Sequence, residues 1–171
     1  MNVVRTYLEM RAPTALRAAA RSDSTLRFEL VDPCPAPLYR ALYRDVGEAY
    51  HWRDRLVWSD AELARHLSRP EVEVWVLWEG DERAGYAELV RHDDGSVEIA
   101  YFGLRANFHG RGLDKHLLTR TVERAWALGA SRVWLHTCTL DGAAALPNYV
   151  ARGFTPYRTE TYTVDIAPEE D

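Results

Sequence analysis

Residues 97–118 read VEIAYFGLRANFHGRGLDKHLL, and this stretch decides the fold. Its first eight residues are mostly apolar and typical of a strand, a short loop carries Gly110 and Gly112, and a helix follows at once. Glycines let a phosphate approach the backbone, and a helix N-terminus offers unpaired N–H groups and the positive end of its dipole. Arg111 and Lys115 add positive charge beside it. The residues predict a di- or polyphosphate site, with a plain strand-to-helix turn as the alternative.

Two nucleotide-binding motifs are absent from this loop. No Gly-Lys-Ser/Thr follows the glycines, so the loop is not a P-loop. It reads GRGLDK at 110–115, which is not the G-x-G-x-x-G of dinucleotide-binding domains. The absence of these motifs argues against a nucleotide hydrolase and against a nicotinamide-dependent dehydrogenase.

Hydrophobic spacing on either side of this stretch predicts the other elements. Strands are expected at Val3–Met10, Leu26–Val31, Glu73–Trp78, Ala84–Arg91, Val97–Leu104, Arg132–Thr137 and Thr159–Ile166. Helices are expected at Leu38–Val46, from Ser59 through SDAELARHL, at Leu113–Leu128 and at Ala143–Arg152. A three-strand meander followed by strand–helix–strand units indicates an α/β (α+β) fold, with a mixed, mostly antiparallel twisted sheet flanked by helices. We expect an N-terminal strand and connector over residues 1–25 and one catalytic domain over residues 26–171.

Composition narrows the class of protein. A chain of 171 residues suits one domain. Its formal net charge of −5 does not indicate a surface that binds nucleic acid. It has no apolar run of about 18 residues, so we expect no membrane span. Cys34 and Cys138 lie far apart in the sequence, and their spacing is not that of metal ligands, so we expect no metal site. We expect both to be free thiols and the protein to be cytoplasmic.

The loop and the helix after it resemble a known family. HGRGLDKHLL, at 109–118, is similar to the acetyl-CoA signature [Q/R]-x-x-G-x-[G/A] of the GNAT superfamily of N-acetyltransferases. NYVARGF, at Asn148–Phe154, resembles the later Y-x-x-x-G-F element of that family. Two positions depart from the pattern: His109 replaces Gln or Arg, and Asp114 replaces Gly or Ala, which places a carboxylate where a pyrophosphate should lie. Val3–Met10 lies outside the usual start of the family.

The resemblance implies direct transfer of an acyl group from acetyl-CoA, or another acyl-CoA, to an amine without a covalent acyl-enzyme. It assigns cofactor binding to Phe102, Gly103, Leu104, His109, Gly110, Arg111, Gly112, Leu113, Asp114 and Lys115. It also implies that Glu98 is the general base and that Tyr149 protonates the departing thiolate. The alternatives are a solvent-facing strand residue for Glu98 and a core tyrosine for Tyr149. His136 is a further candidate base, and Cys138 is interpreted as a core thiol.

The family usually builds its acceptor pocket from the first two helices and their connection, which here is Gly47–Trp58. The substrate-binding candidates in it are Tyr50, Trp52, Arg53 and Arg55. The aromatic rings can form a wall, and either arginine can bind a carboxylate in fork geometry. The alternative is that the rings are core residues and the arginines are solvated. The expected partner is a small amino-acid-like amine or a peptide N-terminus, with no nucleic acid, and a homodimer is compatible with the sequence. A non-catalytic acyl-CoA-binding or sensory module is the second hypothesis.

Overall fold

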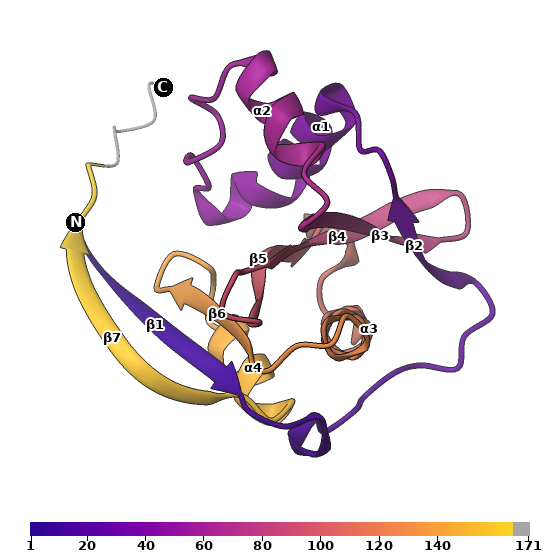
Figure 1. Cartoon of the computed structure of the whole chain (residues 1–171), viewed down its shortest axis with the longest axis vertical. Coiled ribbons are helices and arrows are strands. Elements are labelled where there is room, and N and C mark those ends of the chain that lie inside the picture. Colours follow the sequence, from indigo (N-terminus) through magenta and orange to yellow (C-terminus); the bar gives the residue numbers. More distant parts are fainter. Residues whose placement is uncertain (166–171) are drawn as a thin grey trace.

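The computed structural model describes residues 1–165, which form one seven-stranded sheet with helices on both faces (Figure 1). The strands are β1 (Asn2–Met10), β2 (Leu26–Val31), β3 (Val72–Glu79), β4 (Glu82–Arg91), β5 (Val97–Leu104), β6 (Val133–Cys138) and β7 (Thr155–Thr163). The helices are α1 (Ala36–Gly47), α2 (Asp60–Leu67), α3 (Leu113–Ala127) and α4 (Ala145–Ala151). Of the strand pairs described, β5–β6 is parallel and the others are antiparallel. The predicted mixed, mostly antiparallel sheet is confirmed.

The N-terminal strand lies inside the sheet. The strand order is β2-β3-β4-β5-β6-β1-β7, so β1 pairs with β6 on one side and with β7 on the other. Leu8 and Met10 of β1 are buried in the main core cluster with residues of α3, α4 and β6. The extra strand is therefore a structural part of the sheet, and it joins the chain's first residues to its last strand (Figure 1).

The parallel pair β5–β6 separates almost as soon as it begins. Val97 and Glu98 of β5 pair with Val133 and Trp134 of β6, and beyond these residues the two strands no longer pair with each other in the described structure. Backbone N–H and C=O groups need hydrogen-bonding partners when they are removed from water. The rest of β5 therefore presents an unpaired edge toward β6, in an opening in the middle of the sheet.

A β-bulge on the other side of β5 lies at the same level. Glu88 pairs with Tyr101 while Leu89 pairs with Ile99, which leaves Ala100 as the extra residue. Bulges bend a strand and increase its local twist. The bulge thus accompanies the departure of β5 from β6 and reorients the side chains that follow it.

The helix α3 covers one face of the sheet and α1 with α2 covers the other (Figure 1). The sequence predicts an apolar stripe on α3 made of Leu113, Leu117, Leu118, Val122, Ala125 and Trp126. The first five are buried, and Trp126 is partly buried against the same core. Burial of this stripe fixes where α3 begins, and its N-terminal turn lies beside the end of β5.

The last strand differs from its prediction. It was expected at Thr159–Ile166, but β7 begins at Thr155, and Ile166 lies outside the described residues. The early start includes Pro156, which normally argues against a strand because it lacks an N–H group. Pro156 is tolerated because β7 is an edge strand and because the β1–β7 register shifts between Tyr7 and Leu8, the residue opposite Pro156.

Candidate active site

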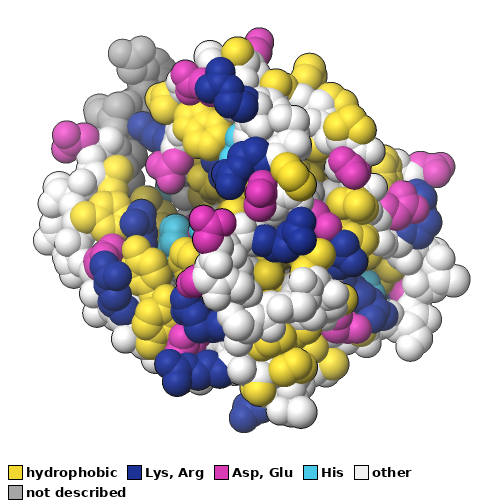
Figure 2. Space-filling view, viewed as in Figure 1, with side chains coloured by type: hydrophobic (Ala, Val, Ile, Leu, Met, Phe, Trp, Pro, Cys, Tyr) yellow, Lys and Arg dark blue, Asp and Glu magenta, His cyan; other side chains and the backbone are white. Residues whose placement is uncertain are grey.

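A cavity of about 950 Å³ occupies the opening between β5 and β6. Its walls come from the connection between α1 and α2 (residues 48–59), from β5, β6 and the start of α3, and from α4 and both terminal strands. Figure 2 shows the surface hollowed between the α1–α2 region and the arm formed by β1 and β7, with hydrophobic and histidine side chains in the hollow. The volume is within the usual range for a small-molecule site, about 300–1,000 Å³.

The glycine loop forms the entrance beside α3. Gly110 and Gly112 both have φ of +74°, and Gly112 is the N-cap residue of α3. A Cβ atom built on either glycine would meet no atom within 4 Å, so the loop faces open space. No side chain caps the first turn of α3. Its N–H groups are therefore available to an anion, as the sequence predicts.

The predicted cofactor residues divide into two groups. Phe102, Gly103, Leu104, His109, Gly110 and Asp114 line the cavity, whereas Arg111, Gly112, Leu113 and Lys115 lie outside its lining. Leu113 is fully buried in the core, and Arg111 forms an ion pair with Glu79 of β3. His109 Nε2 lies 2.9 Å from the hydroxyl of Tyr50 and 3.0 Å from the carbonyl oxygen of Leu104. His109 thus links the glycine loop to the α1–α2 connection.

Tyr149 comes from α4 and borders the cavity. Its ring packs edge-on against Phe102 of β5 and Phe154. Burial raises the pKa of Tyr149, and the charge of Asp141 raises it further. The hydroxyl is therefore protonated at neutral pH, and it makes no hydrogen bond to another residue in the described part of the chain.

Glu98 borders the same cavity from β5. It is the last residue of β5 that pairs with β6, so its side chain lies where the two strands begin to separate. Its Oε1 lies 2.9 Å from Nε2 of His92, which is on the rim of the cavity. The structure thus brings Glu98 and Tyr149 to one cavity from distant parts of the sequence.

The aromatic wall predicted from the α1–α2 connection is present. Tyr50 and Trp52 line the cavity, and Trp52 packs against Tyr43 of α1 and Tyr101 of β5. The indole N–H of Trp52 donates to Asp141 Oδ1 at 3.2 Å. The sequence left open whether these aromatic rings are core residues or a pocket wall. The rings serve both purposes.

Arg55 requires a correction. Its two terminal nitrogens each donate to one carboxylate oxygen of Glu88 at 2.9 Å, and its guanidinium lies over the rings of Trp58 and Tyr101. Glu88 is fully buried, so this ion pair is part of the protein interior. Arg55 is held as a structural clamp and is not available as the predicted fork for a substrate carboxylate. Arg53 also lines the cavity and is exposed.

A family comparison identifies the kind of protein that carries this cavity. The model of the acetyltransferase (GNAT) family matches residues 37–154, from α1 to the residue before β7. The chain belongs to the GNAT acetyltransferase family.

Relatives within the GNAT family are similar over about two thirds of the chain. A mycothiol acetyltransferase of Corynebacterium efficiens is 33% identical over 113 residues, which are 64% of this chain and 38% of that protein. An uncharacterised N-acetyltransferase of Mycobacterium bovis is 30% identical over 113 residues, 66% of this chain and 72% of its own length. The chain thus spans less than half of the mycothiol acetyltransferase that it matches.

Solved GNAT structures share the fold. A GCN5-related N-acetyltransferase from Sphaerobacter thermophilus superposes with a TM-score of 0.69 at 14% identity, covering 92% of this chain and 49% of that one. A GCN5-related N-acetyltransferase from Kribbella flavida superposes with a TM-score of 0.66 at 19% identity, covering 92% of this chain and 56% of that one. At these identities the likeness shows the fold alone.

Two carboxylates escaped the sequence analysis of this GNAT chain: Glu88, which is buried outside the cavity lining, and Asp141, which lines the cavity. Glu88 lies at an inward-facing position of an otherwise apolar strand, GYAELV at 85–90, and that contrast is the signal that could have marked it. Asp141 accepts hydrogen bonds from Thr137 Oγ1 at 2.7 Å and from the Cys138 N–H at 2.9 Å. It had no comparable signal, because it lies in a loop.

Two candidates remain, Cys138 and His136, and the pKa of each is shifted in the direction that favours the neutral side chain. Burial raises the pKa of Cys138, with a further contribution from Asp141, which fits its interpretation as a core thiol. Burial lowers the pKa of His136, and the charge of Arg5 lowers it further. Within residues 1–165, no group of three His, Cys, Asp or Glu side chains is arranged to hold a metal ion. No helix of that region is long and apolar enough to cross a membrane.

Proposed function

We propose that this protein is an acetyl-CoA-dependent N-acetyltransferase that acts on the primary amine of a small amino-acid-like molecule or of a peptide, by direct transfer. The observation that carries the proposal is one continuous cavity, which runs from the uncapped N-terminal turn of α3 through the opening between β5 and β6. Glu98 and Tyr149 lie on its walls.

The residues present fit the coenzyme. The loop at Gly110 and Gly112 has free space and N–H groups for a pyrophosphate, and the unpaired edge of β5 offers backbone groups to the amides of a pantetheine arm. The bound thioester supplies the activated acetyl group. Phe102 and Leu104 line the cavity along the path between these two features.

Proton transfers are assigned to two side chains. Glu98 accepts the proton that the acceptor's ammonium must lose before its nitrogen attacks the thioester carbonyl carbon. Tyr149 donates its hydroxyl proton to the sulfur as the carbon–sulfur bond breaks, so the products are an acetamide and a free thiol. The tyrosinate then recovers a proton from solvent. Support comes from the protonated state of Tyr149 and from the position of Glu98 where the strands separate.

Release of coenzyme A tests the proposal directly. We expect the purified protein to release free thiol from acetyl-CoA only when an amine is present, in a panel of amino acids, short peptides and polyamines. Acetyl-CoA alone should raise the melting temperature, because a ligand at 100 times its dissociation constant adds about 2.7 kcal/mol. No rise in melting temperature would contradict the coenzyme site. A rise without amine-dependent release would favour the non-catalytic binding module.

Asp114→Ala is expected to tighten coenzyme A binding by about fivefold, since an exposed like-charge contact near 4 Å is worth about 1 kcal/mol in water. Asp114 lies in the first turn of α3 and lines the cavity, so its carboxylate would repel a pyrophosphate bound at the N–H groups of that turn. Arg111 offsets this charge little, because Glu79 already neutralises it.

Calorimetric titration of coenzyme A into both proteins measures the effect. Glu123→Ala is the control, since Glu123 is an exposed carboxylate of the same helix, paired with Arg120 and outside the cavity lining. Equal or weaker binding by the Asp114 variant would show that the carboxylate points away from the phosphates.

A further inference from the structure

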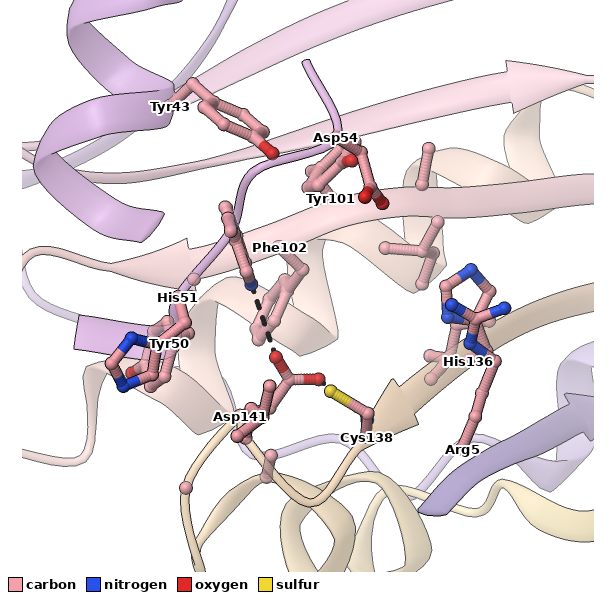
Figure 3. Close-up of a pocket in the computed structure, with 18 of the residues that line it drawn as sticks. Arg5, Tyr43, Tyr50, His51, Asp54, Tyr101, Phe102, His136, Cys138 and Asp141 are labelled. Carbon is pink, nitrogen blue, oxygen red and sulfur yellow. Dashed lines mark hydrogen bonds between the residues drawn. The ribbon is translucent and has the colours of Figure 1, made fainter. Parts of the chain in front are cut away.

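The strand β1 brings a cation into the cavity from outside the region that the family model matches. Arg5 lies opposite Cys138 of β6 in the β1–β6 register, and it lines the cavity. Figure 3 shows its side chain beside His136, on the side of the cavity away from Tyr50 and His51. A residue on a central strand is positioned by two rows of backbone hydrogen bonds, so its place at this wall is well defined.

The charge of Arg5 is only partly matched by the protein. Its nearest carboxylate is Glu160, with Nη1 and Oε2 3.9 Å apart. Glu160 is shared, because it also pairs with Arg158 and accepts a hydrogen bond from the Tyr7 hydroxyl at 3.2 Å. The Nε atom of Arg5 is buried without a hydrogen-bond partner among the described residues. The hydrogen-bonding capacity of this guanidinium is therefore not fully used within the protein.

The guanidinium is also held in place. It lies over the ring of Tyr162 of β7, with its Cζ 4.9 Å from the ring centroid. A guanidinium fixed on an aromatic face loses less freedom when it binds a carboxylate in two-point geometry. Arg5 is therefore a preoriented site for an anionic group.

Negatively charged side chains line other parts of the same cavity. Glu98 and Asp54 both border the cavity with Arg5 and His136. Figure 3 shows Asp54 next to Tyr101, across from the pair formed by Arg5 and His136. The cavity thus offers carboxylates that can face an ammonium and a separate guanidinium that can face an anion.

We propose that Arg5 binds the carboxylate of the acceptor, and that the acceptor is a small amine that also carries a carboxylate. This inference rests on the proposed N-acetyltransferase function and assigns its substrate class. The other two arginines considered for this role are less suitable. Arg55 is neutralised by Glu88, and Arg53 lies exposed without the packing that orients Arg5. The acceptor's amine would then lie toward Glu98, on the side where the acetyl group is transferred.

Matched pairs of acceptors test the inference. The probes are L-alanine, L-phenylalanine, β-alanine and 4-aminobutyrate, each compared with its own amide under saturating acetyl-CoA. We expect the parent to prefer at least one acid over its amide in kcat/KM by about 10- to 100-fold, as for a charge-assisted hydrogen bond. An amide's amine is less basic and is more often unprotonated, which by itself favours the amide. A preference for the acid therefore reports on its carboxylate.

The variants Arg5→Gln and Arg5→Lys locate the effect. Arg5→Gln should abolish the preference mainly by raising KM for the acid, and Arg5→Lys should restore part of it. Arg132→Gln is the control, because the Arg132 side chain is exposed to the same 29% as Arg5 but pairs with Glu9 at 3.1 Å and does not line the cavity. The dissociation constant for acetyl-CoA, measured by calorimetry, should be the same in all four proteins.

Several outcomes would overturn the inference. It is wrong if acids and amides react equally, if only amines without a carboxylate are acetylated, or if Arg5→Gln keeps the parent's preference. Loss of the preference in Arg53→Gln but not in Arg5→Gln would assign the role to Arg53 instead. In each of these cases amine-dependent release of coenzyme A leaves the proposed function standing. Absence of both acetyl-CoA binding and release would remove the proposed function as well.

Discussion

Glu88→Gln is expected to lower the free energy of unfolding by about 3–5 kcal/mol, which is the usual cost of removing one partner from a buried ion pair. The carboxylate of Glu88 is fully buried. Besides Arg55, it accepts a hydrogen bond from the Tyr39 hydroxyl at 2.5 Å and contacts His66 Nε2 at 2.9 Å. Glutamine leaves the guanidinium of Arg55 buried without a counter-charge. Urea denaturation of parent and variant measures the loss.

A second arginine–glutamate pair with two hydrogen bonds provides the control. Arg124 binds both carboxylate oxygens of Glu73 at 2.9 and 2.8 Å, but its side chain is 32% exposed, whereas that of Arg55 is 11% exposed. Glu73→Gln should cost about 1 kcal/mol or less, because exposed pairs contribute about 0–1 kcal/mol. Equal losses in the two variants would show that burial is not the source of the Glu88 effect.

The effect of Glu88→Gln should also depend on pH. Burial by itself would raise the pKa of Glu88, but the hydrogen bond to His66 and the charge of Arg55 outweigh it and hold the pKa below the ordinary value of 4.5. Such a group stabilises the fold fully above its unfolded-state pKa, and the contribution is lost as the pH falls through the folded-state pKa. The difference between parent and variant should therefore be constant near neutral pH and shrink below 4.5.

Tyr149→Phe is expected to lower turnover by about 100-fold while changing the dissociation constant for acetyl-CoA by less than about twofold. General-acid contributions are about 10²–10⁴-fold, and we expect the lower end because burial makes Tyr149 a weaker acid than a free tyrosine. The hydroxyl has no hydrogen-bond partner among the described residues, so its removal should leave the melting temperature nearly unchanged. Single-turnover kinetics with saturating acetyl-CoA separate the chemical step from binding.

Tyr157→Phe is the control for loss of a tyrosine hydroxyl, since Tyr157 is 45% exposed and lies outside the cavity lining. Its turnover should equal that of the parent. If Tyr149→Phe also retains full turnover, Tyr149 is a core residue, and the thiolate leaves without a protein acid.

Local features of the fold were predictable from the sequence. The strand, glycine loop and helix at 97–118, the apolar stripe of α3 and the meander before it all depend on neighbouring residues, whose spacing is visible in the sequence. The resemblance to the family signature drew attention to the glycine loop because the motif is contiguous. The place of β1 was not predictable, since nothing near Val3–Met10 indicates that its partners are β6 and β7.

Side-chain partnerships were the least predictable part of the site. Arg55 and Glu88 are 33 residues apart, and their pairing depends on how the α1–α2 connection lies against β4. The sequence could therefore name Arg55 as a carboxylate fork but could not show that the carboxylate is the protein's own. The same holds for Arg111, whose partner Glu79 lies on β3. Arg5 was overlooked because its relevance comes only from the strand register.

The insertion of β1 between β6 and β7 sets an order of events during folding. In the described structure Asn2 pairs with Thr163, and the N-terminal ammonium donates to the carbonyl of Val164, 163 residues away. Contacts of such long sequence separation form late, because loop closure must precede any gain from them. During synthesis β1 is made well before β6 and β7, the two strands with which it pairs. The β2–β5 meander and α3 can assemble earlier, so the side of the cavity formed by β5 and the start of α3 should form before the wall that carries Arg5.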